Sequence, residues 1–87
     1  MTKLETHLGN LDSRYEKLRS LLIEARKGNG LSQVALGERL GREQTWISKY
    51  ERGARQLDVI EFLDIARAIG VDPSRLIRKL EADSLAS

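Results

Sequence analysis

The 87-residue sequence contains no cysteine, a single proline, a single histidine and no long apolar stretch. Without cysteine, neither disulfides nor thiolate metal sites can stabilise the chain, which fits a reducing compartment. The first 25 residues lack the apolar run of a signal peptide, and nothing approaches the about 20 apolar residues of a membrane span. We therefore expect no membrane association and a cytoplasmic location.

Residues for catalysis or metal binding are equally scarce. The histidine, His7, has neither a cysteine nor a second histidine to share a metal ion with. No glycine-rich phosphate loop or nucleophile motif is present. Asp58, Glu61 and Asp64 fall on one side of an expected helix, where capping and solvation explain them. We expect no enzymatic activity, no metal and no cofactor.

The net charge of +2 is too small to indicate a nucleic-acid partner, but its distribution is uneven. Residues 39–55 contain five arginine and lysine side chains against two glutamates, a net charge of +3. Residues 56–87 contain four basic and six acidic side chains, a net charge of −2. Positive charge concentrated in one segment is typical of a phosphate-binding surface. The alternative is an ordinary solvated charged surface.

Apolar residues recur at helical spacing along most of the chain. Ser13 and Glu16 form a capping-box pattern, so the first helix is expected to begin at Ser13. Its apolar stripe then ends at the Gly28–Gly30 stretch. The members of that stripe are Leu18, Leu21, Leu22 and Ala25.

Two short helices joined by a glycine turn are predicted over residues 32–53. Ser32 is a good N-cap, and Gly41 suits the left-handed conformation that ends a helix. In the second of these helices Ile47 and Tyr50 share an inner face. Polar side chains point outward: Gln44, Thr45, Ser48 and Lys49. This layout is that of a helix-turn-helix.

Two further helices follow. Asp58 and Glu61 cap a fourth helix that Gly70 closes, and Asp72 followed by Pro73 opens a fifth. The inner face of the fourth is expected to contain Val59, Phe62, Leu63, Ala66 and Ile69. The apolar side of the fifth contains Leu76, Ile77 and Leu80. The sequence thus predicts an all-α fold of five helices in one domain over residues 13–81, with a tail at 82–87. Residues 1–12 form an N-terminal arm, either frayed or packed on a partner subunit.

Four short motifs occur in a characteristic order: LSQ at 31–33, LG at 40–41, ISKYERG at 47–53 and IARAIGV at 65–71. From about Leu18 to Leu80 the chain resembles the lambda-repressor-like (Xre/Cro-type) helix-turn-helix family. The resemblance implies a sequence-specific regulator of transcription that binds double-stranded DNA. A repressor-like homodimer on a two-fold operator is expected, because one short helix reads few base pairs. The alternative is a protein-interaction module with the same fold, such as an antitoxin-like partner.

The polar turn of the third helix would contact bases in the major groove. Gln44 suits adenine, Lys49 suits guanine, and the Thr45 methyl group suits thymine. Ser48 completes this set. Phosphate contacts are expected from Gln33, which begins the second helix and has this role in the family, and from Arg42, Arg52 and Arg55. Arg39 is left as a solvated charge.

The resemblance also implies a structural ion pair between Arg26 and Glu51. Three residues depart from the family pattern. Glu43 replaces a small N-cap, Gly37 replaces an alanine, and Trp46 replaces a small polar residue. Trp46 either stacks on a sugar or base, or covers the core. The candidate dimer interface contains Ile60, Ile77 and Leu80, although the helix 5 residues could also close the monomer core.

Overall fold

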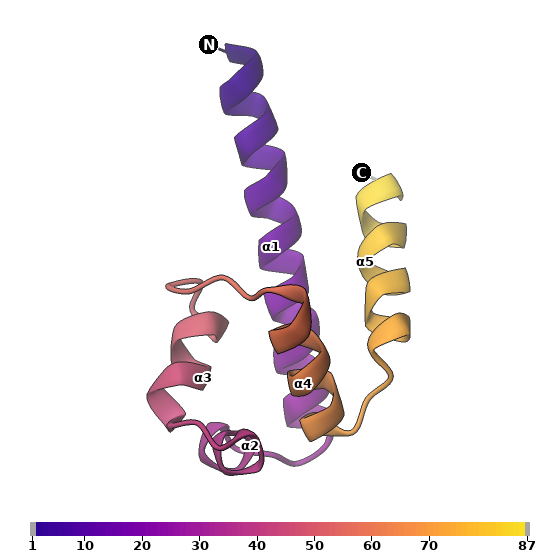
Figure 1. Ribbon diagram of the computed structural model, residues 1–87. Coiled ribbons are helices and arrows are strands. Elements are labelled where there is room, and N and C mark those ends of the chain that lie inside the picture. Colours follow the sequence, from indigo (N-terminus) through magenta and orange to yellow (C-terminus); the bar gives the residue numbers. More distant parts are fainter. Residues whose placement is uncertain (1, 87) are drawn as a thin grey trace.

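The computed structural model describes the backbone of residues 2–86 and the side chains of residues 13–82. Within that range the chain forms five helices and no strand: α1 (Thr2–Gly28), α2 (Gln33–Leu40), α3 (Gln44–Glu51), α4 (Val59–Ile69) and α5 (Pro73–Ala86). The predicted all-α fold is confirmed, and Figure 1 shows the order of the helices along the chain. None of the helices within residues 2–86 has the length and apolar character to cross a membrane.

Most helix ends lie where local chemistry predicts them. The Ser32 hydroxyl accepts a hydrogen bond from the Ala35 N–H at 3.0 Å, and Gly41 adopts a left-handed conformation with φ of 66°. At α4 the Asp58 carboxylate accepts from the Glu61 N–H at 2.7 Å, and the Glu61 carboxylate accepts from the Asp58 N–H at 3.0 Å. This is the reciprocal capping box that the sequence predicted.

Both terminal helices are longer than predicted. Helix α1 begins at Thr2, so Ser13 lies inside it rather than at its N-cap, and α5 continues to Ala86. Glycine and asparagine, as at Gly9 and Asn10, lower helix propensity without removing a backbone donor, whereas an internal proline would break the helix. At 27 residues α1 is about 40 Å long and extends past the other helices (Figure 1). The side chain of His7 lies outside the described residues.

The core is built mainly from α1, α3 and α4, with one contribution each from α2 and α5. Its buried side chains are Leu21, Leu22, Leu36, Ile47, Tyr50, Phe62, Ile65, Ala66, Ile69 and Leu76. The predicted inner face of α4 was wrong at one end, because Val59 is 72% exposed. Helical spacing fixes the angle of a residue about the helix axis but not whether a neighbour lies opposite that turn.

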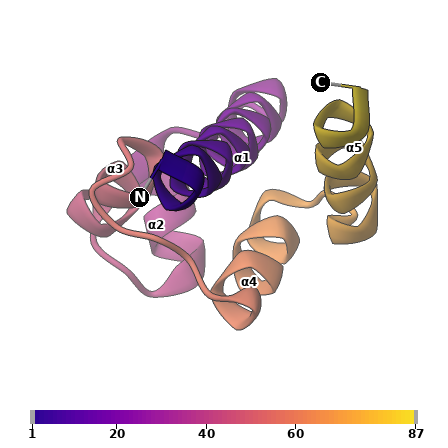
Figure 2. The same ribbon diagram turned by 90° about the horizontal axis from the view of Figure 1, so that it is seen from above.

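Helices α3 and α5 lie on opposite sides of the bundle, with α1 and α4 between them (Figures 1 and 2). The turn from α2 to α3 packs directly on α2 at Gly37. A Cβ atom at Gly37 would lie 2.6 Å from the Arg42 carbonyl oxygen, closer than atoms can approach. Gly37 therefore permits the close approach of the α2–α3 turn to α2.

Candidate nucleic-acid interface

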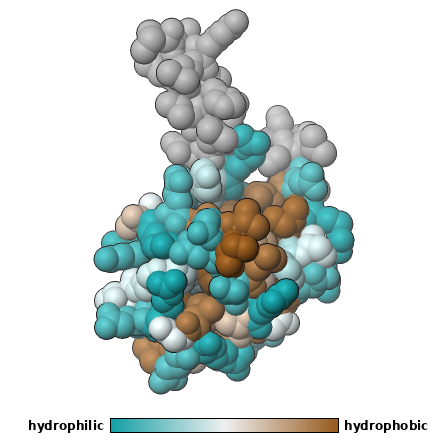
Figure 3. Space-filling view, in the orientation of Figure 1, coloured by the Kyte–Doolittle hydropathy of each residue, from teal (hydrophilic) through white to brown (hydrophobic). Residues whose placement is uncertain are grey.

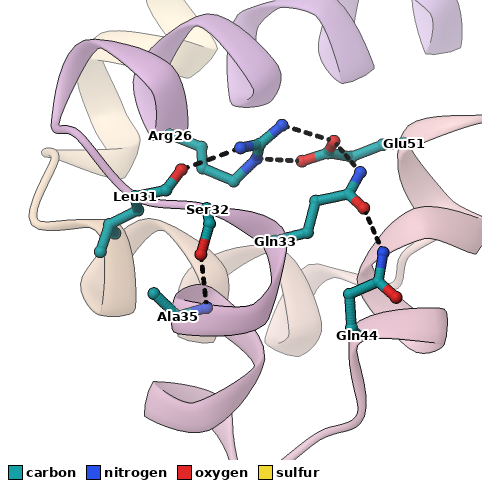
Figure 4. A network of polar contacts seen from close by, with 7 residues as sticks. All are labelled: Arg26, Leu31, Ser32, Gln33, Ala35, Gln44 and Glu51. Atoms are coloured by element: carbon teal, nitrogen blue, oxygen red, sulfur yellow. Dashed lines mark hydrogen bonds and ion pairs between the residues drawn. The ribbon is translucent and has the colours of Figure 1, made fainter.

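A buried ion pair fixes α3 to α1. The Arg26 side chain is only 8% exposed and that of Glu51 5%. Arg26 Nε donates to Glu51 Oε2 at 2.7 Å and Nη2 donates to Oε1 at 3.0 Å, while Nη1 donates to the Leu31 carbonyl at 2.8 Å (Figure 4). The hydrogen bond to Glu51 raises the pKa of Arg26 above its ordinary value. The pair implied by the family resemblance thus joins α1, the α1–α2 connection and α3.

The same carboxylate begins a chain of hydrogen bonds that reaches the surface. Gln33 Nε2 donates to Glu51 Oε1 at 2.9 Å, and Gln44 Nε2 donates to Gln33 Oε1 at 2.6 Å (Figure 4). An amide nitrogen carries two N–H groups, so each glutamine retains a donor for a further bond. Gln44 is exposed and Gln33 is half-buried. The first residue of α3 is therefore held in place from the core outward.

The outer face of α3 is polar and open to solvent. Gln44, Thr45 and Lys49 are exposed, whereas Ser48 is half-buried and its Oγ accepts from Arg52 Nε at 3.2 Å. The cap residue Glu43 makes no side-chain bond to the helix N-terminus. The Thr45 hydroxyl instead donates to its carboxylate at 3.5 Å. Helix α3 lies at the edge of the bundle (Figure 2), which agrees with the exposure of Gln44, Thr45 and Lys49.

Comparison with known proteins assigns the chain to a family. A family model described as a helix-turn-helix domain matches residues 17–78. A solved structure of an XRE-family like protein from Pseudomonas syringae pv. tomato is 46% identical, with a TM-score of 0.84, over 94% of this chain and 96% of that one. The chain belongs to the Xre-type helix-turn-helix family. The family assignment supports a DNA-binding regulator of transcription.

Two further structures have the Xre-type fold. The restriction-modification controller protein C.AhdI from Aeromonas hydrophila is 30% identical, with a TM-score of 0.67, over 74% of this chain and 97% of that one. The clp gene regulator ClgR from C. glutamicum is 18% identical, with a TM-score of 0.72, over 80% and 91% of the two chains. At that identity the likeness to ClgR shows the fold alone. No curated protein sequence matches this chain.

This Xre-type domain carries a cluster of arginines around its tryptophan. The guanidinium carbons of Arg42 and Arg55 lie 4.5 Å and 4.8 Å from the Trp46 ring centroid. Arg55 also forms two hydrogen bonds to Glu61, from Nη2 at 2.7 Å and Nη1 at 3.0 Å. Arg55, followed by the Asp58 N–H, lowers the pKa of Glu61 to about 2. Of the predicted phosphate ligands, Arg55 is thus already paired within the protein.

Two arginines have contacts that sequence reasoning missed. Arg39, left as a solvated charge, donates to the Ala68 carbonyl near the end of α4 at 2.8 Å. Arg19 of α1 lies against Gly53, where a Cβ atom would be 2.9 Å from its guanidinium carbon. No local motif could have predicted either contact, because each joins segments that are distant in sequence.

Proposed function

We propose that this protein is a sequence-specific regulator that places the N-terminal turn of α3 in the major groove of double-stranded DNA. The observation that carries the proposal is the hydrogen-bonded chain from the buried Arg26–Glu51 pair through Gln33 to exposed Gln44. A side chain held in place before binding loses less conformational entropy on contact. Such an arrangement suits a residue that must meet one base edge rather than a residue that is merely solvated.

Roles within the interface follow from exposure and chemistry. The Gln44 amide, with one donor and its oxygen still available, suits the donor and acceptor of adenine, and Lys49 suits the acceptors of guanine. The Thr45 methyl group suits thymine. Ser48 is the weakest member of this set, because its hydroxyl already bonds Arg52. Gln33, at the start of α2, would donate its remaining N–H to a backbone phosphate.

A gel-shift assay with genomic fragments at low and high salt tests the proposal. Affinity should fall steeply as salt rises, because each neutralised phosphate releases counterions. With oligonucleotides selected by the wild type, Gln44→Ala and Lys49→Ala should flatten base preference, since each bidentate contact discriminates by about 1–3 kcal/mol. Gln33→Ala should weaken binding to every duplex, because a phosphate contact is made on any sequence. Absence of a shifted species at both salt concentrations would favour a protein-interaction module instead.

We propose further that two copies bind a two-fold operator. An apolar patch supports this, lying over α4 and the neighbouring side of α5 (Figure 3). On α4 Val59 is 72% exposed and Ile60 65% exposed, and on α5 Ile77 is 40% exposed, whereas Leu80 packs partly against the core. Exposed apolar surface of this kind is typical of protein interfaces. Leu80 is therefore the weakest of the three predicted interface residues.

Sedimentation velocity tests the dimer. Ile60→Asp should shift the protein towards monomer at a concentration where the wild type is dimeric. Val34 on α2 is 54% exposed and supplies the matched control, because Val34→Asp adds the same charge away from the patch. Equal effects of the two substitutions, or a wild type that is monomeric even on duplex DNA, would refute this assembly.

A further inference from the structure

Trp46 is the sole tryptophan of the chain and lies on α3 beside the polar turn. It is half-buried and packs against the hydrophobic core. Its ring meets that of buried Tyr50 edge to face, with centroids 5.6 Å apart and planes at 67°. The core thus fixes the orientation of the indole.

The two arginines over this ring come from either side of α3. Arg42 lies in the turn before the helix, and Arg55 lies in the connector after it. Both guanidiniums are within the about 6 Å over which a cation is attracted to an aromatic face. Trp46 therefore contacts cationic groups from both of the segments that flank α3.

The two guanidiniums differ in what remains available to a ligand. Arg55 donates to both carboxylate oxygens of Glu61 and to the Gln56 carbonyl. Arg42 is exposed, and its guanidinium carbon lies over the Trp46 ring at 4.5 Å from the centroid. The N–H groups of a guanidinium lie in its plane, so they stay free to donate when the face is covered. Glu61 hydrogen-bonds Arg55, whereas it acts on Arg42 only through the attraction between their charges.

We infer that Trp46 is a positioning residue that holds the guanidinium of Arg42 ready to bind a phosphate of the DNA backbone. Arg55 on the same ring has a structural role, because it is held in an ion pair with Glu61. This inference rests on the proposed function. The ligand is the phosphodiester and not a base, so the contact is independent of sequence. Stacking restricts the rotamers of a long side chain before binding, which reduces the entropy lost on contact.

The test uses a mixed-sequence DNA duplex, since a phosphate contact needs no operator. Dissociation constants are measured by fluorescence anisotropy across a salt series, at a temperature where circular dichroism shows every variant folded. Arg42→Ala should weaken binding and reduce the slope of log affinity against log salt by about one. Arg78, an exposed arginine on α5, supplies the equal-charge control, and Arg78→Ala should leave the slope unchanged.

The positioning role has its own readout. Arg42→Lys and Trp46→Leu both keep the positive charge, so both should retain the wild-type salt slope while binding about two- to fivefold more weakly. Trp46→Phe keeps an aromatic face and should bind nearly as the wild type does. In the Arg42→Ala background, Trp46→Leu should cause no further loss, because the guanidinium that it positions is gone.

Each other outcome counts against the inference. If Trp46→Leu lowers only the melting temperature, or weakens binding equally with and without Arg42, then Trp46 is a core residue without this role. If Arg42→Ala matches Arg78→Ala, then Arg42 is not a phosphate ligand. In both cases duplex binding by the wild type would leave the proposed function standing. Failure of the wild type to bind the duplex would overturn both.

Discussion

The Arg26–Glu51 pair gives the sharpest prediction about stability. Both side chains are almost completely buried, and the carboxylate receives two hydrogen bonds from Arg26 and one from Gln33. Replacing Arg26 with methionine keeps much of the side-chain volume but leaves the Glu51 charge without its cation. A buried charge without its partner loses the interaction that offset its desolvation.

The expected loss is a large fraction of the total stability. Removing one member of a buried pair costs about 3–5 kcal/mol. A domain of this length has a free energy of unfolding of only about 4–13 kcal/mol, at roughly 0.05–0.15 kcal/mol per residue. Replacing both members with methionine should cost much less than the sum of the two single changes, because no uncompensated charge remains.

Urea titrations followed by circular dichroism measure the four corners of this cycle: wild type, Arg26→Met, Glu51→Met and the double variant. The more exposed Arg55–Glu61 pair supplies the control, with side chains 33% and 16% exposed. Arg55→Met should cost less than either single change at the buried pair, because a more exposed ion pair contributes little to stability. The reasoning would fail if Arg26→Met and Glu51→Met each lowered the free energy of unfolding by less than about 1 kcal/mol and the two losses were additive. The pair would then behave as an exposed ion pair.

Three further predictions concern the scaffold. Gly37→Ala should lower the urea midpoint, because strain of about 1–3 kcal/mol against the Arg42 carbonyl exceeds the propensity gain of about 1 kcal/mol; a raised midpoint would show that the turn can move. The lowered pKa of Glu61, about 2 against an ordinary 4.5, makes its contribution to stability complete above pH 4.5 and progressively lost towards pH 2. Glu61→Gln should therefore reduce stability at neutral pH, and the stability of the variant should fall less than that of the wild type between pH 4.5 and pH 2. Urea titrations at a series of pH values measure both, and parallel pH profiles of the two proteins would contradict this. Ser32→Ala should cost about 1 kcal/mol of unfolding free energy by the same titration, and no measurable loss would mean that the observed cap contributes nothing.

The parts of the fold that sequence predicts are those governed by local chemistry. A cap such as Ser32 and a left-handed glycine such as Gly41 act within four residues, so their effect is visible in the chain itself. The apolar spacing of Ile47 and Tyr50 fixes which side of α3 faces the core. The outward direction of Gln44 and Lys49 follows from that, before any neighbouring helix is placed.

The predictions that were wrong depended on the surroundings of a residue. Ser13 has a strong capping pattern, but a cap acts only where the helix actually begins, and α1 continues to Thr2. Val59 has the spacing of an inner residue, yet no neighbour covers its turn of α4. Trp46 left two interpretations open, and the structure shows it packed against the core and under two guanidiniums. Arg42 comes from the turn before α3 and Arg55 from the connector after it, and neither segment has a periodicity from which these contacts could be predicted.

Stability and recognition share one carboxylate in this molecule. Glu51 accepts from Arg26 in the interior and from Gln33 towards the surface, and Gln33 in turn accepts from Gln44. A substitution at Glu51 therefore changes both the folded fraction and the freedom of the residue proposed to read a base. Gln33→Ala separates the two effects, because it leaves the buried pair intact while releasing Gln44. If ordering of Gln44 contributes to specificity, Gln33→Ala should also weaken discrimination at the base that Gln44 contacts, in addition to its loss on every sequence.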